Sequence, residues 1–358
     1  MKQLKSAHVN ILACAFIVLI FGLWSEDEEE LKFLEEYISF STVAELPMRF
    51  LSKEEAWDNS APDAVEIMIP REGDEPGQPA MWYDSGSERE KPVLLVLHSW
   101  SEDFQQHFGI PYAVFARKND WVFIHPDFRG EFDNKDATGS EKTVRDILQA
   151  LEYARENASV DESRIYLTGF SGGAMMTLIM AGRYPERFTA ASAWVPIYDL
   201  NDWYEYLLKT PYAYTEKYQQ DIEASCGGPP DTDEQAREEC GRRSPSAYLK
   251  NARGKDIRIF VSGGLKDPFV PPSHAIRVFN DLADPEDGIS EEDYLYIDEN
   301  QSLPQGLEER EVSDPFFEEA GLEVVFAIES ANITLFLFDG GHDIIYNKSL
   351  NWLSGQKR

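Results

Sequence analysis

The stretch RIYLTGFSGGAMM, residues 164–176, carries the strongest indication of the fold. The apolar run from Arg164 to Thr168 predicts a strand, and an apolar helical pattern runs from Gly172 to Arg183, where Pro185 ends it. Between them, glycines flank Ser171 and allow the sharp turn that leaves a serine hydroxyl clear of the backbone. Strand, G-x-S-x-G turn and helix, in this order, predict a nucleophile elbow with Ser171 at its tip.

Short apolar runs and helical patterns alternate on both sides of this stretch. The clearest helix runs from Glu141 to Asn157 and has one apolar stripe. Near-continuous apolar strands separated by amphipathic helices are typical of a mostly parallel sheet with helices on both faces. We therefore predict an α/β fold with a doubly wound sheet. The expected strands are Val65 to Ile69, Val93 to Leu97, Trp121 to His125, Arg164 to Thr168, Ala190 to Val195, Ile257 to Ser262 and Ile333 to Phe338.

A serine hydroxyl is a weak nucleophile, so Ser171 needs an imidazole that takes its proton and a carboxylate that orients that imidazole. Among the histidines, His342 is best placed, because it follows the last predicted strand in the loop DGGHD, residues 339–343. This position near the carboxyl end fits the chain order serine, acid, histidine that accompanies such an elbow. A surface histidine without a role is the alternative for His342.

The orienting carboxylate is expected at Asp267, which comes directly after the predicted strand that precedes the last one. Asp199, which follows the strand before that, is the competing choice. Asp339 and Asp343 are too close in sequence to His342 to reach around its ring. A buried structural role is the alternative for each of these carboxylates.

Acyl transfer also needs hydrogen-bond donors that face the developing oxyanion. The backbone N–H of Gly172, directly after the serine, is expected to be one donor. The second is expected from the loop HSW, residues 98–100, where the backbone of Ser99 or Trp100 could supply it. The indole of Trp100 could equally form a wall of the substrate pocket.

Two segments interrupt the alternation of strands and helices. Residues 200–251 are rich in Trp and Tyr and are expected to form a cap inserted between two strands. Trp203 and Tyr204 of this cap, together with Trp100, are candidate substrate-binding residues, although such aromatic sets more often form cap core. Residues 281–320 are strongly acidic and are expected to form a solvated, loop-rich insertion.

Cys226 and Cys240 bracket a polar loop rich in Gly and Pro within the cap segment. This pattern predicts a disulfide, which would stabilise the fold by about 3 kcal/mol in the chain-entropy model. Two unpaired thiols are the alternative. A disulfide would agree with an oxidising compartment.

The amino-terminal residues have the pattern of an export segment. Lys2 and Lys5 precede an apolar centre at residues 11–24, and acidic residues follow. Such an order predicts a signal peptide or membrane anchor over residues 1–25, and so a periplasmic, extracellular or membrane-anchored protein. A buried helix is the alternative, but the apolar run lacks a polar face.

The rest of the chain is divided accordingly. Residues 26–60 are expected to form an acidic leader with a short helix, and residues 61–355 to form the catalytic domain. Of the 358 residues, 42% are hydrophobic, which is enough for one large core. The formal net charge of −32 argues against nucleic acid as a partner, because it would repel phosphates. Contact with a membrane is expected only through an uncleaved segment 1–25.

No metal ion or organic cofactor is expected. The histidines lack H-E-x-x-H spacing, and the cysteines do not form a C-x-x-C pair. No glycine-rich phosphate loop of the Walker or dinucleotide type follows a strand.

Together these motifs resemble the α/β-hydrolase superfamily and, more narrowly, the catalytic domains of the prolyl oligopeptidase family and related esterases. The resemblance covers roughly residues 90–352. It implies a triad of Ser171, Asp267 and His342 that forms a covalent acyl-enzyme. The motifs that carry it are VDESRI (160–165), GFSGG (169–173), DFRG (127–130), DPFVP (267–271) and GGH (340–342).

Two departures from the family pattern favour an esterase over a peptidase. About sixty residues precede the first predicted strand, too few for the propeller that such peptidases carry. In addition, HSW at residues 98–100 replaces the usual His-Gly-Gly loop. We therefore expect an exported serine esterase acting on a small-molecule or oligosaccharide ester. The alternatives are a serine peptidase acting on short peptides and a non-catalytic binder with the same fold.

Overall fold

The computed structural model describes residues 50–358, except residues 72, 74, 211–212 and 308–312. The predicted export segment, residues 1–25, and the first part of the acidic leader, residues 26–49, lie outside the described residues. Among the helices that are described, none combines the length and the apolar character needed to cross a bilayer.

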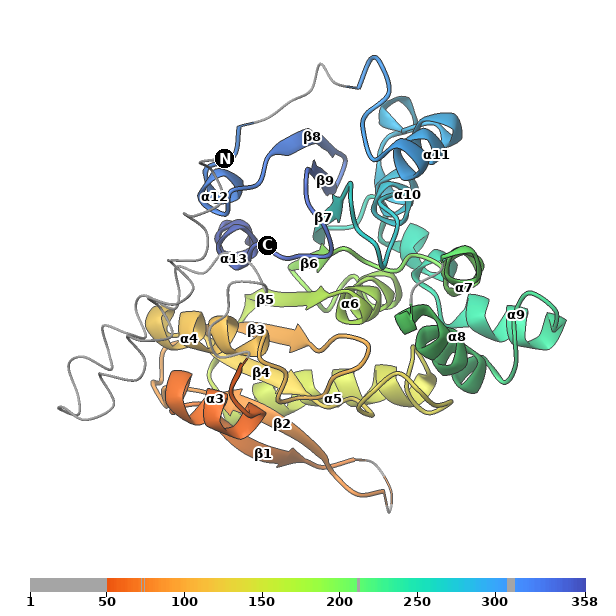
Figure 1. The fold of residues 1–358 in the computed structure, drawn as a ribbon. Helices are drawn as coiled ribbons and strands as arrows, with labels where there is room; N and C mark the ends of the chain where they lie inside the picture. The colour runs from red at the N-terminus through yellow and green to blue at the C-terminus, as the bar shows by residue number, and fades with distance from the viewer. Residues whose placement is uncertain (1–49, 72, 74, 211–212, 308–312) are drawn as a thin grey trace, which may run out of the picture. The chain divides into compact units, whose positions relative to one another are not determined.

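A mixed sheet forms the centre of the described domain (Figure 1). Its strands are β1 (Val65–Ile69), β2 (Gln78–Tyr83), β3 (Lys91–Leu97), β4 (Val122–Pro126), β5 (Val160–Phe170), β6 (Ala190–Trp194), β7 (Arg258–Gly264), β8 (Val324–Ser330) and β9 (Ile333–Phe338). They are ordered β1-β2-β4-β3-β5-β6-β7-β9-β8. Neighbours from β4 through β9 are parallel, whereas β1, β2 and β8 pair antiparallel. The mostly parallel sheet predicted from the apolar runs is therefore confirmed.

The apolar runs do not predict β2 and β8. β2 has Pro79 at its second position, and a proline argues against a strand that is paired on both sides. The Pro79 carbonyl still contributes to pairing, since it accepts a hydrogen bond from the Asp127 N–H at 3.0 Å. β8 is an edge strand with alternating burial, a weaker signal than a continuous apolar run.

Helices cover both faces of the sheet (Figure 1). They are α4 (Gly109–Asn119), α5 (Glu141–Asn157), α6 (Gly172–Arg183), α10 (Ser273–Leu282) and α13 (Tyr346–Ser354). α4 and α13 lie on one face, and α5, α6 and α10 lie on the other. α5 and α6 have the bounds that the sequence predicts. Ser140 caps α5, because its hydroxyl accepts a hydrogen bond from the Thr143 N–H at 3.1 Å.

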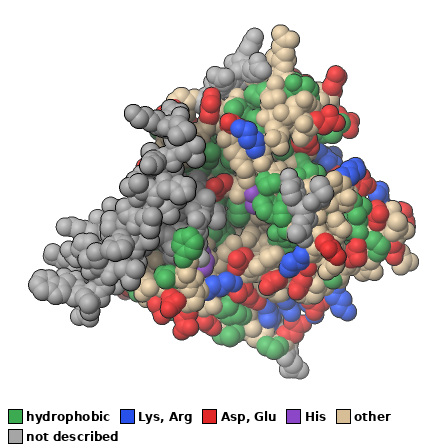
Figure 2. Space-filling model, viewed as in Figure 1, with side chains coloured by type: hydrophobic (Ala, Val, Ile, Leu, Met, Phe, Trp, Pro, Cys, Tyr) green, Lys and Arg blue, Asp and Glu red, His purple; other side chains and the backbone are tan. Residues whose placement is uncertain are grey.

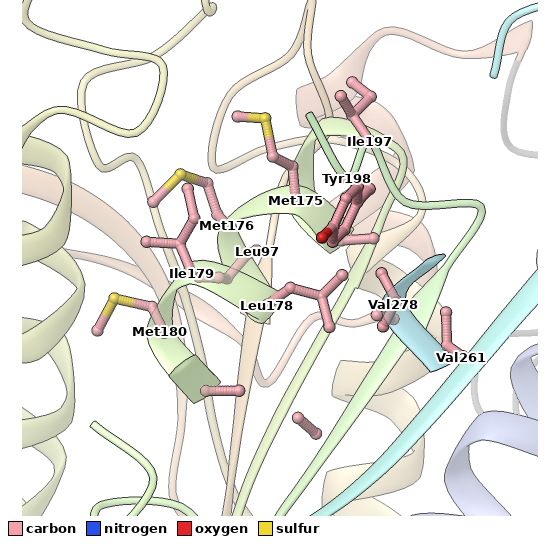
Figure 3. Packing of buried hydrophobic residues seen from close by; sticks show 14 of the residues in the cluster. Leu97, Met175, Met176, Leu178, Ile179, Met180, Ile197, Tyr198, Val261 and Val278 are labelled. Atoms are coloured by element: carbon pink, nitrogen blue, oxygen red, sulfur yellow. The ribbon is translucent and has the colours of Figure 1, made fainter. Parts of the chain in front are cut away.

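α6 lies in the middle of the hydrophobic core (Figure 3). Its side chains from Met175 to Met180 are fully buried, close to Leu97 of β3, Val261 of β7 and Val278 of α10. A helix that is apolar all round belongs in a core rather than at a surface. Because α6 begins at Gly172, this core also fixes the position of the turn before it.

The cap segment between β6 and β7 is helical. It contains α7 (Leu200–Lys209), α8 (Ala213–Cys226), α9 (Glu234–Arg242), and the 3₁₀ turns η3 (Pro245–Ala247) and η4 (Leu249–Ala252). A disulfide between Cys226 and Cys240 joins the end of α8 to α9, as predicted, with an S–S distance of 2.07 Å. Closing the loop between these helices restricts the unfolded chain and so stabilises the cap.

The acidic segment is less loop-rich than we predict. Among its described residues lie the turn η5 (Pro285–Asp287) and the helices α11 (Glu291–Asn300) and α12 (Pro315–Glu319). Ser290 caps α11. Three acidic residues in its first turn, Glu291, Glu292 and Asp293, interact favourably with the positive end of the helix dipole. The charge run is therefore a helix start as well as a solvated surface. Figure 2 shows Asp and Glu side chains spread over one face of the molecule, with Lys and Arg among them.

A helix from the predicted leader packs on the catalytic domain. α3 (Lys53–Ser60) begins with a capping box between Ser52 and Glu55. Its Trp57 is 2% exposed, lies 6.1 Å from the Phe123 ring on β4, and donates a hydrogen bond from its indole to the Gln105 carbonyl at 2.9 Å. The described domain therefore includes this part of the leader.

Candidate active site

Ser171 lies in the strained turn that the G-x-S-x-G pattern predicts. Its backbone has φ 57° and ψ −120°, a region that residues with a side chain rarely adopt. The Ser171 N–H donates to the Trp194 carbonyl at 2.9 Å, which ties the turn to β6. A Cβ added to Gly169 would lie 2.3 Å from the Gly173 backbone, and one added to Gly173 would lie 2.1 Å from the Leu97 carbonyl oxygen. Only glycine fits these two positions, so β5, the turn and α6 can approach closely.

His342 and Asp267 form a direct pair. The imidazole Nδ1 lies 2.6 Å from the Asp267 Oδ2, and the Asp267 side chain is fully buried. The other carboxylate oxygen accepts hydrogen bonds from the N–H groups of Phe269, at 2.8 Å, and Val270, at 3.0 Å. With Nδ1–H donating to Asp267, the imidazole Nε2 is left as a proton acceptor.

The two loops that carry this pair are held together by backbone hydrogen bonds. The Leu265 N–H donates to the Phe338 carbonyl at 2.9 Å, and the Lys266 N–H donates to the Gly340 carbonyl at 2.9 Å. The pairing continues the parallel register of β7 and β9 beyond the strand ends. The separation of Asp267 and His342 is therefore set by the sheet.

Sheet topology also brings His342 toward Ser171. β5, β6, β7 and β9 are successive parallel neighbours, so the segments after β5, β7 and β9 lie at one edge of the sheet. The His342 ring lies 4.8 Å from the ring of Phe170, which directly precedes Ser171, and 5.0 Å from the ring of Phe269. Two aromatic rings thus position the imidazole beside the turn.

The competing carboxylates have other partners. Asp199 caps α7, accepting from the Asn201 N–H at 2.9 Å, and it also accepts from the Ser246 hydroxyl at 2.5 Å. Asp339 pairs with Lys266, and Asp343 accepts the N–H of Ile344 at 2.8 Å. Asp267, by contrast, bonds the His342 ring directly.

The backbone of Trp100 lies next to Gly172, the residue that follows Ser171. A Cβ added to Gly172 would lie 2.8 Å from the Trp100 backbone nitrogen, so the Trp100 backbone passes close to the Gly172 Cα, next to Ser171. The Ser99 N–H, the alternative donor in this loop, points elsewhere and donates to the Gln106 side chain at 2.8 Å. Of the two backbone donors expected in this loop, Trp100 is thus the one adjacent to the turn.

The aromatic residues expected to bind substrate are mostly buried. Trp100, Trp203 and Tyr204 are each no more than 3% exposed, so little of their ring surface is accessible to a ligand. The Tyr204 hydroxyl donates to Glu223 of α8 at 2.6 Å, and burial together with this contact raises the pKa of Tyr204 above its ordinary value. The Trp203 indole donates to the Phe269 carbonyl at 2.8 Å.

These cap contacts extend to the loop after β7, which carries Asp267. The hydroxyls of Tyr206 and Tyr214 both donate to the Pro268 carbonyl, at 3.1 and 2.9 Å. The ring of Tyr214 also lies 4.4 Å from the half-buried ring of Phe269. The cap therefore supports the residues directly after Asp267. Sequence reasoning missed Phe269, although its place two residues after Asp267, between prolines, could have indicated it.

The DFRG motif has a structural function. The Arg129 side chain donates to Asp146 of α5 at 3.1 Å and pairs with Glu75 at 2.7 Å, and Arg71 donates to the same Asp146 at 2.8 Å. Asp146 is nearly fully buried, so it needs these cations. The motif thereby ties the loop after β4 to α5.

Two other buried histidines, His125 and His274, are held neutral. Burial lowers the pKa of His125 and of His274 to about 3 each. The His274 Nδ1 accepts a hydrogen bond from the Tyr198 N–H at 2.9 Å. In the part of the chain that the structure describes, no group of three or more His, Cys, Asp or Glu side chains could hold a metal ion.

Comparisons with known proteins place these features in a family. Residues 107–302 match the prolyl oligopeptidase family, Peptidase S9. The chain is 29% identical over 131 residues to feruloyl esterase B of Talaromyces funiculosus, covering 34% of this chain and 37% of that enzyme. It is 31% identical over 134 residues to an acetylxylan esterase of Coprinopsis cinerea, covering 34% of this chain and 36% of that enzyme. The matches therefore span little more than a third of the length of these relatives.

Among solved structures, the acylaminoacyl peptidase of Pyrococcus horikoshii is similar, with a TM-score of 0.48 and 18% identity, over 61% of this chain and 34% of that one. The family match itself takes in more than half of this chain, and its bounds include the elbow at Ser171 and the acid loop at Asp267. Together with the sheet topology, it establishes that the chain has the α/β-hydrolase fold and belongs to the prolyl oligopeptidase family.

Proposed function

We propose that this protein is a serine hydrolase, and more specifically an esterase, with Ser171 as nucleophile, His342 as general base and Asp267 as the orienting acid. One observation carries the proposal: Ser171 has φ 57° at the start of α6, while a His342–Asp267 pair at 2.6 Å lies at the same edge of the sheet. A strained serine beside a preorganised imidazole is the arrangement that acyl transfer requires.

In the proposed reaction, His342 Nε2 takes the Ser171 proton as Oγ attacks the ester carbonyl carbon. The carbonyl oxygen becomes an oxyanion that accepts hydrogen bonds from the N–H groups of Gly172 and Trp100. The imidazolium then protonates the leaving alcohol, and an acyl-enzyme remains on Ser171. Water, activated by the same imidazole, releases the acid and restores the serine.

We propose a carbohydrate-linked ester as substrate. Support comes from the similarity to enzymes named feruloyl esterase and acetylxylan esterase. The half-buried ring of Phe269 lies 5.0 Å from the imidazole and 6.5 Å from the half-buried ring of Tyr218, and both rings would offer faces on which a sugar or an aromatic acyl group could stack. Export from the cytoplasm is part of the proposal, supported by the disulfide and by the apolar segment within residues 1–25.

The first test replaces the nucleophile. We expect Ser171→Ala to lower hydrolysis of a small activated ester by roughly 10⁴-fold or more, because no acyl-enzyme can form. Ser159→Ala is the matched control, since Ser159 directly precedes β5 and its hydroxyl bonds only the Glu88 carbonyl among the described groups. Turnover retained in Ser171→Ala would refute the assignment.

A peptidase acting on short peptides is the second candidate, favoured by the peptidase family that the chain matches. A panel of acyl esters, acetylated and feruloylated oligosaccharides, and peptide amides separates the two. We expect kcat/KM for the esters to exceed that for matched amides by orders of magnitude. A preference for amides would establish the peptidase instead, and failure of a fluorophosphonate probe to label Ser171 would favour a non-catalytic binder.

A further inference from the structure

A buried hydrogen bond joins the cap to the proposed oxyanion loop. The indole Nε1–H of Trp100 donates to the Asp221 Oδ2 at 3.0 Å, across 121 positions of sequence. Asp221 lies on α8 and is 7% exposed. Its charge is compensated by Lys217, one turn earlier on α8, whose Nζ lies 2.8 Å from the same oxygen. Burying a carboxylate costs free energy unless it is paired and hydrogen-bonded, and the Trp100 indole and Lys217 supply these partners to Asp221.

The Trp100 ring is fixed on several sides. Its centroid lies 4.8 Å from the Trp203 ring of α7, 5.3 Å from the Phe132 ring and 6.3 Å from the Tyr218 ring of α8. The Trp100 carbonyl accepts the Phe132 N–H at 2.8 Å. With the ring locked and the following peptide held, the Trp100 backbone can rotate little.

The Trp100 backbone nitrogen is the group that meets Gly172. Since that nitrogen lies 2.8 Å from where a Gly172 Cβ would be, beside the turn that carries Ser171, a small rotation at Trp100 would turn its N–H away from the proposed oxyanion. The Ser99 N–H cannot replace it, because that group already donates to Gln106. Contacts made to the Trp100 indole by other parts of the molecule can therefore fix the orientation of the Trp100 backbone N–H.

We propose that Asp221 is a positioning residue: by binding the Trp100 indole from the cap, it holds the Trp100 backbone N–H in the orientation that stabilises the oxyanion. The inference rests on the proposed function of Ser171 and deepens it. The cap then has two roles, one at each side of the site. Its tyrosines support the acid loop at Pro268, and its α8 carboxylate sets the oxyanion donor.

The experiment compares Asp221→Ala with Glu223→Ala. Glu223 is the matched control, because it also lies on α8 and accepts a cap hydrogen bond from Tyr204, yet no contact joins it to Trp100 among the described residues. We measure the rate at which a fluorophosphonate labels Ser171, and kcat and KM for a small activated ester. We expect Asp221→Ala to lower the labelling rate and kcat roughly tenfold to a hundredfold, with KM changed less than about twofold, since losing a donor outright costs about 10²–10³. Glu223→Ala should match the wild type.

Two further variants separate positioning from folding. Asp221→Asn keeps an oxygen that can accept the indole N–H, so it should recover most of the activity lost in Asp221→Ala. Trp100→Phe keeps the ring packing but removes the indole N–H, and should lower the labelling rate as Asp221→Ala does. The double variant should be no slower than either single one, because both remove the same bond. If Asp221→Ala does not fold, the labelling rates of Trp100→Phe and Asp221→Asn alone test the positioning role of Asp221.

The outcomes distinguish this inference from the proposed function. If the probe does not label the wild type, the serine hydrolase proposal falls, and the role of Asp221 falls with it. If the wild type is labelled and Asp221→Ala or Trp100→Phe reacts at the wild-type rate, Ser171 keeps its role and the positioning by Asp221 is refuted. Equal losses in Asp221→Ala and Glu223→Ala would also refute it, because they would reflect the stability of the cap alone.

Discussion

The two halves of the site are held by different kinds of bond. Asp267 and His342 extend from β7 and β9, and hydrogen bonds between backbone groups join the two loops. The cap helices α7 and α8 reach the site through side chains, chiefly Asp221, Tyr206 and Tyr214, and a disulfide joins α8 to α9. Backbone pairing tolerates most substitutions, whereas a side-chain contact is lost with a single residue.

This difference separates the groups proposed to react, which the sheet positions, from the cap contacts that can modify the rate. Groups that move protons need a fixed geometry, which a sheet supplies in every member of a fold. Contacts made by an inserted cap can change without disturbing the sheet, so they are where one family member can differ from another. Substitution of the reacting side chains proposed on the sheet side should therefore abolish turnover, and substitution of the cap side chains that contact the site should reduce turnover or weaken the fold.

The largest effect is expected on the sheet side. Asp267→Asn should lower kcat by on the order of 10⁴-fold, because an amide cannot hold the imidazole in the required tautomer. The melting temperature should change little, since the amide oxygen can still accept the N–H groups of Phe269 and Val270. Asp339→Asn, in the same pair of loops but paired with Lys266, serves as control. A loss of less than tenfold in Asp267→Asn would mean that another carboxylate orients His342.

A moderate effect is expected in the cap. The double variant Cys226→Ser/Cys240→Ser should lower the free energy of unfolding by about 3 kcal/mol, measured by urea titration. Its kcat should fall far less than that of Asp267→Asn, because the proposed triad is carried by the sheet and not by the cap. Wild-type protein treated with a reductant should give the same unfolding curve as the variant, which separates the disulfide from the serine substitutions. If kcat fell as much as in Asp267→Asn, the geometry of the reacting groups would depend on the cap as strongly as on the sheet.

The smallest effect concerns Asp298 of α11, whose Oδ1 accepts the N–H of Ser273 at the start of α10. Burial raises the pKa of Asp298 to about 6, against the opposing hydrogen bond from Ser273. The folded protein thus binds this proton more tightly than the unfolded chain does. The resulting stability is fully present below about pH 4 and is lost as the pH rises through about 6.

Asp298→Asn should therefore raise stability at pH 8 by on the order of 1 kcal/mol and leave stability near pH 4 unchanged. Urea midpoints at the two pH values measure the effect. Glu292→Gln, at an exposed position on the same helix whose charge is not among the causes of the Asp298 shift, is the control. An equal shift at both pH values would attribute the change to packing rather than to the proton.

Local sequence patterns were sufficient to predict most of the sheet and the loops at its carboxyl edge. Apolar runs predict the central strands, and the glycines around Ser171 predict its turn, because both depend on residues adjacent in sequence. The pair of Asp267 and His342 was predictable from the order of strands, since carboxyl ends of parallel strands share an edge. β2 and β8 were not predicted, because β2 contains a proline and β8 is an edge strand with alternating burial instead of a continuous apolar run.

The cap side was less predictable, for a physical reason. Composition indicates that Trp203 and Tyr204 belong together, but it cannot tell whether such rings face a substrate or each other, and the structure buries both. The bond between Trp100 and Asp221 joins segments more than a hundred residues apart, with no shared periodicity to connect them. The choice between Ser99 and Trp100 as donor likewise depends on Gln106, a neighbour that no motif includes.

The packing of α3 constrains how this protein can mature. Trp57 covers Phe123 and lies 6.4 Å from the ring of His125, and its indole bonds the loop that also holds Gln106. A protease that trimmed the chain beyond Ser52 would remove this cover and expose apolar surface of the central sheet to water. Any processing of the amino-terminal region that yields a stable enzyme must therefore cut upstream of α3.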